Sequence, residues 1–267
     1  MPLVKDKVKV IICGNKEITE KCLNFMKKRK DTEVVLWVRD STTMQVKQLI
    51  QRNNPDFIFS IQHEYLIPKD VLEIPTSGCI NLHFGLLPEY GGCYPIAHSI
   101  LNNEDYGGFT LHEMNEEFDK GPVIHKQRIY IKDLVAVEAY NKIVKEAFRY
   151  FTHIYPYLIS NTYSIITPDP KAITRYYKKN SINFKEDSCI TSDMSESDIM
   201  ITFRAFTFPK YQRPKLKIGK EEMTVHNIVK INTKYEEDFL RNITVPSLYD
   251  TYLFENIEGK TFLAWIR

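Results

Sequence analysis

Long apolar runs and an excess of one charge are both missing from this 267-residue sequence. No stretch approaches the roughly 20 apolar residues of a membrane-spanning helix, and the N-terminal "MPLVKDKVKVIICGNKE" has only a short apolar run broken by charges, unlike a signal peptide. The 36 Lys and Arg residues nearly balance the 34 Asp and Glu residues, which gives a net charge of +2. Dedicated nucleic-acid binders usually carry a basic excess. We therefore expect a soluble, cytoplasmic protein that binds neither membranes nor nucleic acids, with room for a local basic pocket for one phosphorylated ligand.

Paired cysteines and glycine-rich loops are also missing. The five cysteines are an odd number and no two are spaced as C-x-x-C, so a disulfide framework or a structural zinc site is disfavoured and a reducing compartment is expected. Gly14 stands alone in "CGNKEITE", without the G-x-G-x-x-G pattern that binds dinucleotides. Four histidines fall in one region, but without H-E-x-x-H or tight ligand spacing, so we predict no metal site. They are His83, His98, His112 and His125.

Over the first 160 residues, short β-rich apolar runs alternate with stretches of helical spacing. The predicted strands are 8–13, 33–38, 56–61, 78–83, 107–114 and 121–131. The predicted helices are 17–30, 42–55, 68–74, 93–103 and 134–159. Alternation of this kind predicts right-handed βαβ crossovers. The fold class is therefore α/β, with a Rossmann-like, mostly parallel sheet.

The character of the sequence changes after "TPDPKAI" (167–173), where the chain becomes more polar. A "SESD" helix start (195–198) precedes "IMITFRAF" (199–206), and short strand candidates follow. We expect a main domain over 1–168 and a smaller α+β or β-rich domain over 169–267. The aromatic residues near the C-terminus fit a homodimer interface or an ordinary small core equally well. They are Tyr249, Tyr252, Phe254, Phe262 and Trp265.

Asn81, His83 and Asp119 could carry chemistry together. Asn81 and His83 lie two residues apart at the end of a predicted strand, so both side chains face the same side. Asp119, in the loop "EEFDKG", could reach the carboxyl edge of the sheet, where ligands bind in open α/β folds. The trio suits acyl transfer to an amine: the amide stabilises an oxyanion, the imidazole takes a proton, and the carboxylate orients the imidazole. Spacing alone, however, favours ordinary polar residues at strand ends.

The motif around these residues resembles a known family. "INLHFGLLPEYGG" followed by "PIAHSILNNEDYGGFTLHEMNEEFDKGPVI" is similar to the signature of the N10-formyltetrahydrofolate-dependent formyltransferases, in which an Asp follows the His by about 36 residues. The resemblance implies catalytic roles for Asn81, His83 and Asp119. It also implies N10-formyltetrahydrofolate as co-substrate. Two positions depart from the pattern: Phe84 replaces a frequent Pro, and Gly91 stands where many members have Arg.

Within this superfamily, the sequence resembles the nucleotide-sugar branch. "VRDSTTMQ" (38–45) runs straight from strand to helix, without the long basic loop of the methionyl-tRNA enzymes, and the glycinamide ribonucleotide enzymes lack a counterpart of 170–267. "FSIQHEYLIP" (59–68) and "FRAFTFPKYQRPKLKI" (203–218) look like the enzymes that formylate dTDP-linked amino-dideoxysugars for surface polysaccharides. The implied acceptor is dTDP-4-amino-4,6-dideoxyglucose. A formyltetrahydrofolate hydrolase, another formyltransferase branch and a catalytically idle sugar-nucleotide binder stay open as alternatives.

The resemblance also implies two sets of binding residues. The folate would contact Tyr65, Ile67, Glu116, Phe118 and Asp119. The nucleotide sugar would contact Asn15, Lys16, Tyr94, Arg204 and Tyr211. Aromatic rings stack on bases and Arg matches phosphate oxygens. Core packing explains Ile67 and Phe118 equally well, and each substrate candidate could be an ordinary surface residue.

Overall fold

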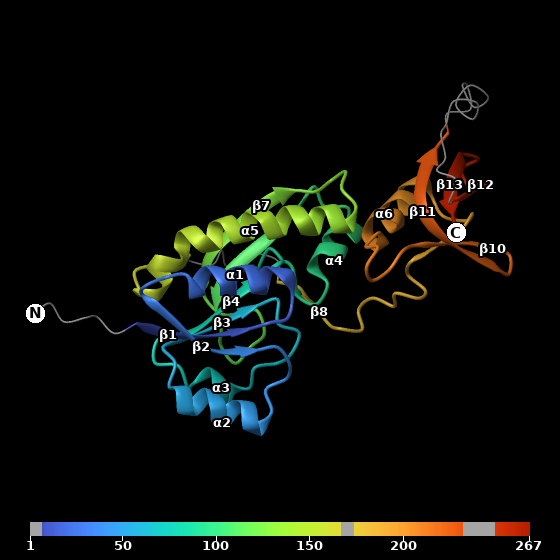
Figure 1. The fold of residues 1–267 in the computed structure, drawn as a ribbon. Helices are drawn as coiled ribbons and strands as arrows, with labels where there is room; N and C mark the ends of the chain where they lie inside the picture. The colour runs from blue at the N-terminus through green and yellow to red at the C-terminus, as the bar shows by residue number, and fades with distance from the viewer. Residues whose placement is uncertain (1–6, 167–173, 232–248) are drawn as a thin grey trace, which may run out of the picture. The chain divides into compact units, whose positions relative to one another are not determined.

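A computed structural model describes residues 7–166, 174–231 and 249–267, and the chain divides into two compact units (Figure 1). The first unit draws on residues within 1–95, 107–129 and 141–177, and the second on residues within 96–106, 130–140 and 178–267. The second unit therefore takes two short segments that come before residue 141 and are separated in sequence from the rest of it. The predicted domain boundary at 168/169 lies outside the described residues and stays a prediction.

A six-stranded sheet with the order β2-β1-β3-β4-β6-β7 forms the centre of the first unit. Its strands are β1 (Val8–Cys13), β2 (Thr32–Val38), β3 (Phe57–Ile61), β4 (Gly78–His83), β6 (Tyr106–Glu113) and β7 (Val123–Tyr130). The pairs β1–β2, β1–β3 and β3–β4 are parallel, and β4–β6 is antiparallel. The predicted α/β class with a mostly parallel sheet is confirmed.

The helices up to residue 159 follow the predicted order, with shorter bounds. They are α1 (Glu17–Lys27), α2 (Met44–Asn53), α3 (Lys69–Leu72), α4 (Pro95–Leu101) and α5 (Ala136–Ile159). Local sequence fixes the ends of α2: the Thr43 side chain accepts a hydrogen bond from the amide of Val46, and Asn54 ends the helix in the left-handed region at φ 44°.

Helices cover both faces of the sheet because side chains alternate along each strand. Phe59 of β3 packs on Phe151 and Tyr155 of α5, with ring centroids 5.9 and 5.5 Å apart. Ile58 points the other way, into a core shared with Ile50 of α2, and also with Val71 of α3 and Cys79 of β4. Burial of one large apolar side chain contributes about 1.5–3 kcal/mol, so both faces hold the sheet in place.

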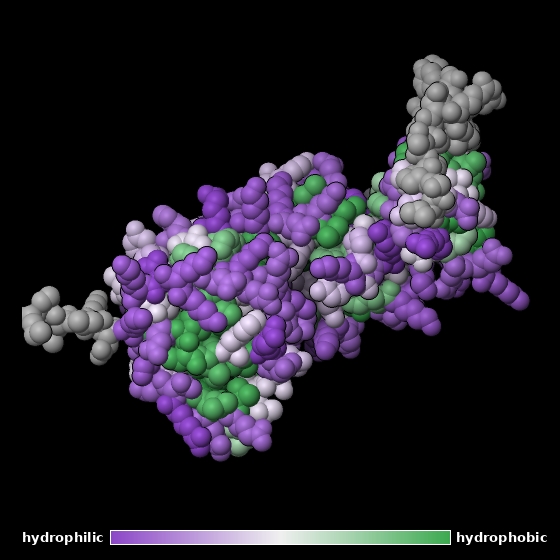
Figure 2. All heavy atoms as spheres, viewed as in Figure 1, coloured by the Kyte–Doolittle hydropathy of each residue, from purple (hydrophilic) through white to green (hydrophobic). Residues whose placement is uncertain are grey.

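Strand β2 forms one edge of this sheet. Figure 2 shows apolar side chains gathered over it, between α1 and α2, where Val34, Val35, Leu36 and Trp37 are half-buried. The indole Nε1 of Trp37 donates to the carbonyl oxygen of Gly14 at 2.9 Å. This bond ties the edge strand to the turn that follows β1.

The second unit has a five-stranded sheet with the order β12-β13-β11-β10-β9, and one helix after β9. Its elements are β9 (Cys189–Ile190), α6 (Glu196–Phe206), β10 (Lys215–Ile218), β11 (Glu221–Lys230), β12 (Asp250–Glu255) and β13 (Thr261–Ile266). Ser195 caps α6 by accepting a bond from the amide of Asp198 at 3.1 Å, where the "SESD" motif predicted a helix start. The predicted β-rich smaller domain thus has a counterpart in this unit.

Two of the C-terminal aromatic residues belong to the unit's own core. Phe254 and Phe262 are 7% and 0% exposed, and their rings stack at 5.4 Å. Ile199 and Phe203 of α6 pack into the same cluster. The core of the second unit therefore accounts for Phe254 and Phe262, and a dimer interface is not needed to explain these two residues.

In the part of the chain that the structure describes, none of the helices has the length and apolar character needed to span a membrane.

Candidate active site

The carboxyl end of β4 carries Asn81 and His83 on the face that also holds Cys79. Strand β6 runs antiparallel to β4, and this register places His112 opposite Asn81 and Thr110 opposite His83. The amide Nδ2 of Asn81 lies 3.0 Å from Nε2 of His112. His83 and His112 are 8% and 2% exposed. Two neighbouring strands therefore bring an amide and two imidazoles together in a buried place.

Asp119 reaches the same place from the loop between β6 and β7. Its backbone adopts φ 54°, a left-handed conformation that is uncommon outside glycine. Its Oδ1 lies 3.5 Å from Nδ2 of Asn81, 3.7 Å from Nδ1 of His83 and 3.6 Å from Nε2 of His112. The three residues selected from the sequence thus converge within the first unit.

The loop after β4 holds His83 and Asp119 through its main chain. Nε2 of His83 lies 2.7 Å from the carbonyl oxygen of Tyr90, and because a carbonyl only accepts, Nε2 carries the proton and Nδ1 keeps its lone pair. The amide of Gly92 donates to Oδ2 of Asp119 at 2.7 Å. Gly85 leaves the space that this arrangement needs, since a Cβ there would lie 2.5 Å from Nε2 of His83.

A short strand from the end of the first unit supports this loop. Strand β5 (Gly91–Gly92) pairs in parallel with β8 (Tyr176–Tyr177). The ring of Tyr177 stacks on Tyr90 at 5.8 Å. Gly92 adopts φ +88°, and a Cβ there would lie 2.2 Å from the carbonyl oxygen of Tyr177. Both the positive φ and the close approach of β8 require glycine at this position.

Burial and charge set the protonation states of His83 and Asp119. Burial lowers the pKa of His83 below its usual value, although the nearby Asp119 opposes this shift. For Asp119, burial acts to raise the pKa, but the charge that His83 carries when protonated and the hydrogen bond from the amide of Gly92 lower it to about 2. At neutral pH, the site therefore holds a neutral imidazole beside an ionised carboxylate. Such a pair can take a proton and stabilise the resulting imidazolium.

His112 is a member of this cluster that the sequence analysis considered only as one of several scattered histidines. Its Nδ1 donates to the carbonyl oxygen of Glu113 at 2.7 Å, so Nε2 is left to accept from Asn81. This contact fixes which way the Asn81 amide points. Alternation along 107–114 places His112 on one face of its strand, but only the register of β6 against β4 could have shown that it meets Asn81.

The predicted folate residues lie in different surroundings. Ile67 is 4% exposed and packs in the core beside α3, and Glu116 forms an ion pair with Lys69. Tyr65 and Phe118 are 42% and 51% exposed. The ring of Phe118 lies 6.2 Å from that of Tyr176. Phe118, next to Asp119 in the sequence, is thus largely exposed to solvent, whereas Ile67 is part of the core.

Among the predicted substrate residues, Asn15, Lys16 and Tyr94 belong to the first unit. Asn15 and Lys16 follow β1, and Nζ of Lys16 lies 2.6 Å from the Glu64 carboxylate. Tyr94 follows the loop that holds the trio and has φ 55°. Burial raises the pKa of its hydroxyl, with smaller contributions from Cys93 and Glu64.

Arg204 and Tyr211 belong to the second unit. The guanidinium of Arg204 donates to the carbonyl oxygens of Leu134 and Ile131 at 3.2 and 3.3 Å. Tyr211 is 69% exposed, with its ring 5.3 Å from that of Phe208. Their roles in substrate binding stay predictions.

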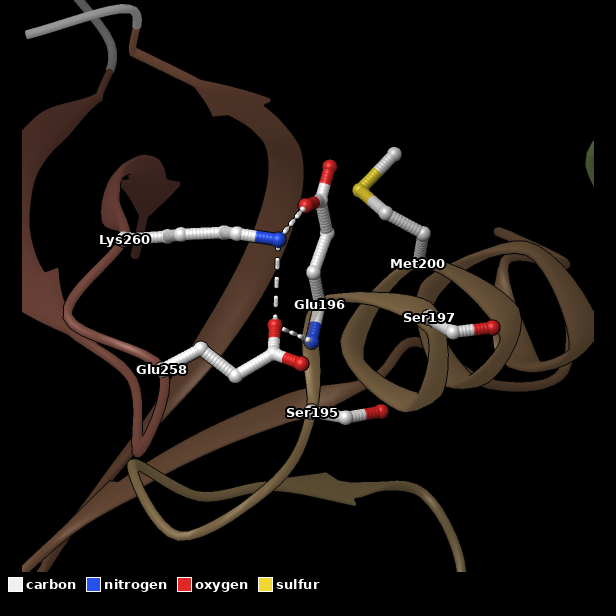
Figure 3. Close-up of a pocket in the computed structure, with 6 residues that line it drawn as sticks. All are labelled: Ser195, Glu196, Ser197, Met200, Glu258 and Lys260. Carbon is white, nitrogen blue, oxygen red and sulfur yellow. Dashed lines mark hydrogen bonds and ion pairs between the residues drawn. The ribbon is translucent and has the colours of Figure 1, made fainter.

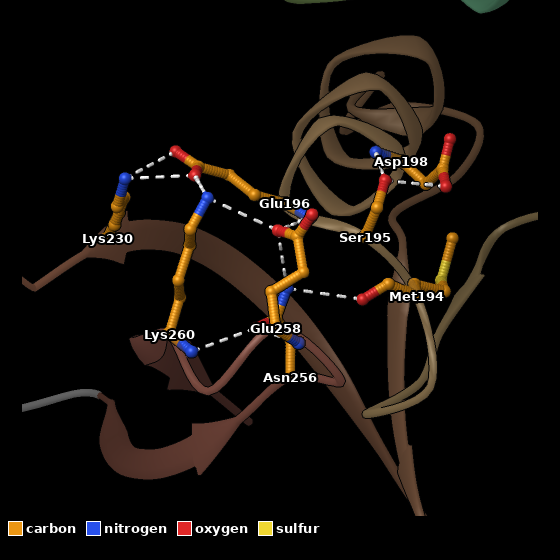
Figure 4. A network of polar contacts seen from close by, with 8 residues as sticks. All are labelled: Met194, Ser195, Glu196, Asp198, Lys230, Asn256, Glu258 and Lys260. Carbon is orange, nitrogen blue, oxygen red and sulfur yellow. Dashed lines mark hydrogen bonds and ion pairs between the residues drawn. The ribbon is translucent and has the colours of Figure 1, made fainter.

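The second unit carries a depression of its own at the start of α6 (Figure 3). It is lined by Ser195, Glu196, Ser197, Met200, Glu258 and Lys260. Lys230 and Lys260 pair with Glu196 at 2.8 and 2.6 Å, and the Glu258 carboxylate accepts from the amide of Glu196 at 3.1 Å (Figure 4). These charges satisfy one another and join α6 to the sheet. We call them the Glu196 network.

Within the described ranges, no group of three or more His, Cys, Asp or Glu side chains is arranged to hold a metal ion.

Comparison with known proteins points to one family. Residues 37–150 match the formyl transferase family model, a stretch that includes the trio. The bifunctional polymyxin resistance protein ArnA of Wigglesworthia glossinidia brevipalpis is 26% identical over 176 residues, covering 66% of this chain and 26% of ArnA. The methionyl-tRNA formyltransferase of Caldicellulosiruptor saccharolyticus is 28% identical over 189 residues, covering 66% of this chain and 57% of that enzyme. The chain therefore spans from about a quarter to just over half of these relatives.

Solved structures share the fold more fully. An N-formyltransferase from Helicobacter canadensis, in complex with folinic acid and dTDP-3-aminofucose, matches with a TM-score of 0.72 and 18% identity, covering 97% of this chain and 100% of that one. A 4-N formyltransferase from Francisella tularensis matches with a TM-score of 0.70 and 22% identity, covering 82% and 96%. The resemblance found in the sequence is confirmed, and the fold is that of the formyltransferases.

Proposed function

We propose that this chain, whose residues 37–150 match the formyl transferase family model, moves the formyl group of N10-formyltetrahydrofolate to the amine of a nucleotide-linked amino sugar. The observation that supports this proposal most is the convergence of Asn81, His83 and Asp119 at the carboxyl end of β4. The trio supplies an amide donor, a neutral base and a carboxylate. Transfer of a formyl group to an amine needs these three groups and no protein nucleophile.

His83 acts as the base in this scheme. As the acceptor amine attacks the formyl carbon and forms the new C–N bond, Nδ1 of His83 takes a proton from the amine. Asp119, 3.7 Å away, stabilises the imidazolium that forms. The formyl oxygen becomes an oxyanion, and the Asn81 amide donates to it. His83 then returns the proton to N10 as the bond between N10 and the formyl carbon breaks, which releases tetrahydrofolate and the formamide.

The acceptor that we favour is dTDP-4-amino-4,6-dideoxyglucose, used for surface polysaccharide synthesis. Support comes from the fold neighbours, because the Helicobacter structure holds dTDP-3-aminofucose and the Francisella protein is a 4-N formyltransferase. These two neighbours differ in the position of the amine, so both 3-amino and 4-amino sugars belong in the test. We place the enzyme in the cytoplasm, where the folate donor is made available, and propose that it acts as a homodimer.

A second candidate is formylation of methionyl-tRNA, which the match to the Caldicellulosiruptor enzyme favours. The near-neutral net charge of +2 argues against it, because binding tRNA relies on a basic surface. Hydrolysis of the donor to formate is a third outcome that the same trio could support.

An activity screen separates these candidates. The protein is incubated with N10-formyltetrahydrofolate and, in turn, dTDP-, UDP- and GDP-linked 3-amino and 4-amino sugars, or with methionyl-tRNA. The expected result is a gain of one formyl group by a nucleotide-linked amino sugar, read by mass spectrometry. Formylation of methionyl-tRNA alone, or release of formate without any acceptor, would replace the proposal.

A further inference from the structure

Three buried polar atoms in the segments that follow β1 and β3 have no hydrogen-bond partner among the described residues. They are Oδ1 of Asn15 and both ring nitrogens of His63. Buried polar atoms in native proteins are nearly always hydrogen-bonded, so an unpaired group calls for an explanation, and at a sheet edge that can bind ligands a bound group is one. A histidine with both nitrogens unpaired is the strongest such signal in this unit. His63 belongs to none of the binding sets that the sequence implied.

These atoms follow the ends of adjacent parallel strands. In the β1–β3 register Cys13 pairs with Ser60, so Asn15 and His63 come two and three residues after this last pair. The chain makes sharp turns here: Gln62 has φ 51°, and a Cβ on Gly14 would lie 2.1 Å from the carbonyl oxygen of Ile61. The Lys16–Glu64 ion pair spans the same two segments. The backbone therefore holds both side chains at one edge of the sheet.

This edge is where the strand order reverses. From β1, the chain continues to β2 on one side and then to β3 on the other, and ligands of open α/β sheets bind in the crevice outside such a reversal. Strand β3 also pairs with β4, with Ile61 opposite Leu82. Neighbouring strands are about 4.8 Å apart, so a single hexose ring could reach from the trio on β4 to this edge.

The chemistry of these atoms selects the kind of group that fits. Burial lowers the pKa of His63, and this outweighs the opposing effects of Glu64 and Asp40. The neutral ring offers one N–H donor and one acceptor, and Asn15 adds a second acceptor. Hydroxyl groups, which both donate and accept, satisfy this set. A phosphate would face two acceptors, and the charge of Lys16 is already offset by Glu64.

We propose that His63 and Asn15 bind ring hydroxyl groups of the acceptor sugar and hold its amine toward His83. The inference rests on the proposed function, since it assigns a place to the sugar of that reaction. His63 is thus a specificity-determining residue for the sugar, separate from the groups that hold the nucleotide or the folate.

Steady-state kinetics of His63→Phe test this assignment, with the acceptor that the wild-type enzyme uses in the screen. The variant keeps a ring of similar size and removes both nitrogens. The KM for the nucleotide sugar is expected to rise at least tenfold, while the KM for N10-formyltetrahydrofolate changes less than twofold. Because the change removes unpaired buried polar atoms, the melting temperature should stay the same or rise, which a structural histidine would not allow.

His125→Phe is the matched control. Nε2 of His125 is also buried, and no described residue forms a hydrogen bond with it, but its ring stacks on Tyr150 of α5 at 3.7 Å and lies near Phe109. Alternation along β6 places Phe109 on the face opposite Thr110 and His112. The same substitution there should leave both KM values unchanged.

A measurement on the wild-type protein covers the case in which His63→Phe does not fold. Adding dTDP-4-amino-4,6-dideoxyglucose, or the acceptor found in the screen, should shift the ring resonances of His63 in NMR spectra, and dTDP alone should not. An active wild-type enzyme with an unchanged sugar KM in His63→Phe, or equal shifts with dTDP alone, would overturn this inference only. A wild-type enzyme that formylates no amino sugar would overturn the proposed function as well.

Discussion

Two groups of polar and charged side chains in this protein differ sharply in how they are satisfied. At the end of β4, the side chains of His83 and Asp119 are 9% and 13% exposed and their closest atoms are 3.7 Å apart. In the Glu196 network of the second unit, Lys260 and Glu258 are 39% and 41% exposed, and Lys260 lies 2.6 Å from Glu196. His83 and Asp119 are buried and lie in loose contact with each other, whereas the charges of the Glu196 network are open to water and form tight pairs.

This difference distinguishes a group of side chains suited to catalysis from one that supports the structure. Exposed ion pairs are screened by water and contribute little to stability. Buried groups that only partly satisfy one another keep shifted pKa values and free hydrogen-bonding capacity, which is the condition of a catalytic site. A depression lined by charges is therefore weaker evidence of function than a few buried groups brought together from separate segments.

The largest expected effect comes from the buried group. Asp119→Asn or His83→Asn should lower kcat by about 10³-fold or more, because the base or the charge that stabilises it is lost. Steady-state kinetics of formyl transfer, with circular dichroism to verify the fold, measure this effect. A kcat near that of the wild type in either variant would show that the buried His83–Asp119 group is no more important for catalysis than the Glu196 network.

A smaller loss is expected from His112→Phe. Without Nε2 of His112, the Asn81 amide loses the acceptor that orients it, and loss of a well-placed oxyanion donor typically costs about 10²-fold or more in kcat. Since His112 acts through Asn81, we expect a drop in kcat of about 10- to 100-fold, with KM values for both substrates little changed. His112→Gln, whose side-chain oxygen can accept a hydrogen bond, should recover part of the activity. Equal activity of both variants with the wild type would assign His112 to packing alone.

Gly92→Ala tests the support beneath the site. A side chain there meets the carbonyl oxygen of Tyr177 and the backbone has φ +88°, and strain of this kind costs about 1–3 kcal/mol. We expect a lower free energy of unfolding in urea, together with reduced kcat, because the amide of Gly92 holds Asp119. Gly219→Ala is the control: it also has a positive φ but nothing within 4 Å of its Cβ, and it lies in the second unit. A reduced stability with unchanged kcat would show that β8 does not position Asp119.

The dependence of stability on pH should follow the buried histidines. Burial lowers the pKa of His98 from 6.5 to about 4, and it lowers that of His83 as well. The unfolded chain takes up these protons below pH 6.5 while the folded chain does not, so the free energy of unfolding falls as pH drops from about 6.5 toward about 4. Urea melts across this range measure the fall. A His98→Gln variant should show a shallower slope, and an identical slope would argue against a neutral, buried His98.

The smallest effect is expected from the Glu196 network. Glu196→Gln removes its pairs with Lys230 and Lys260, and exposed pairs of this kind should lower the melting temperature by no more than about 4 °C. The kcat of formyl transfer should not change, and high salt should reduce the difference in melting temperature. A large loss of kcat would show that the depression lined by the Glu196 network takes part in the reaction, contrary to this account.

The sequence predicted the chain order of the six strands of the larger sheet and of helices α1 to α5, because apolar periodicity and turn residues indicate it directly. The helix predicted over 42–55 extends only over Met44–Asn53 in the structure, because Thr43 and Asn54 cap its ends. The prediction was too long because the residues that flank the helix also fit a helical pattern. The start of α6 could be placed within a residue because Ser195 is a strong cap. The assignment of segments 96–106 and 130–140 to the second unit could not be predicted, because it depends on tertiary packing.

Asn81, His83 and Asp119 could be selected from the sequence because the family motif carries them. Their neighbours could not, because pairing between distant strands has no local signal. His112 meets Asn81 through the β4–β6 register, and Gly92 reaches Asp119 through its main chain. The sequence likewise cannot show that the ring nitrogens of His63 lack hydrogen-bond partners, because this depends on how the surrounding residues pack.

The fate of a labelled formyl carbon tests the central claim most directly. The enzyme is given N10-formyltetrahydrofolate labelled with ¹³C in the formyl group, together with the amino-sugar acceptor, and the label is followed by NMR. Our account predicts that the label appears in a formamide on the sugar, and that Asp119→Asn leaves it on the folate. Label that appears as free formate at the same rate without the acceptor, or that leaves the folate as fast with Asp119→Asn as with the wild type, would contradict it.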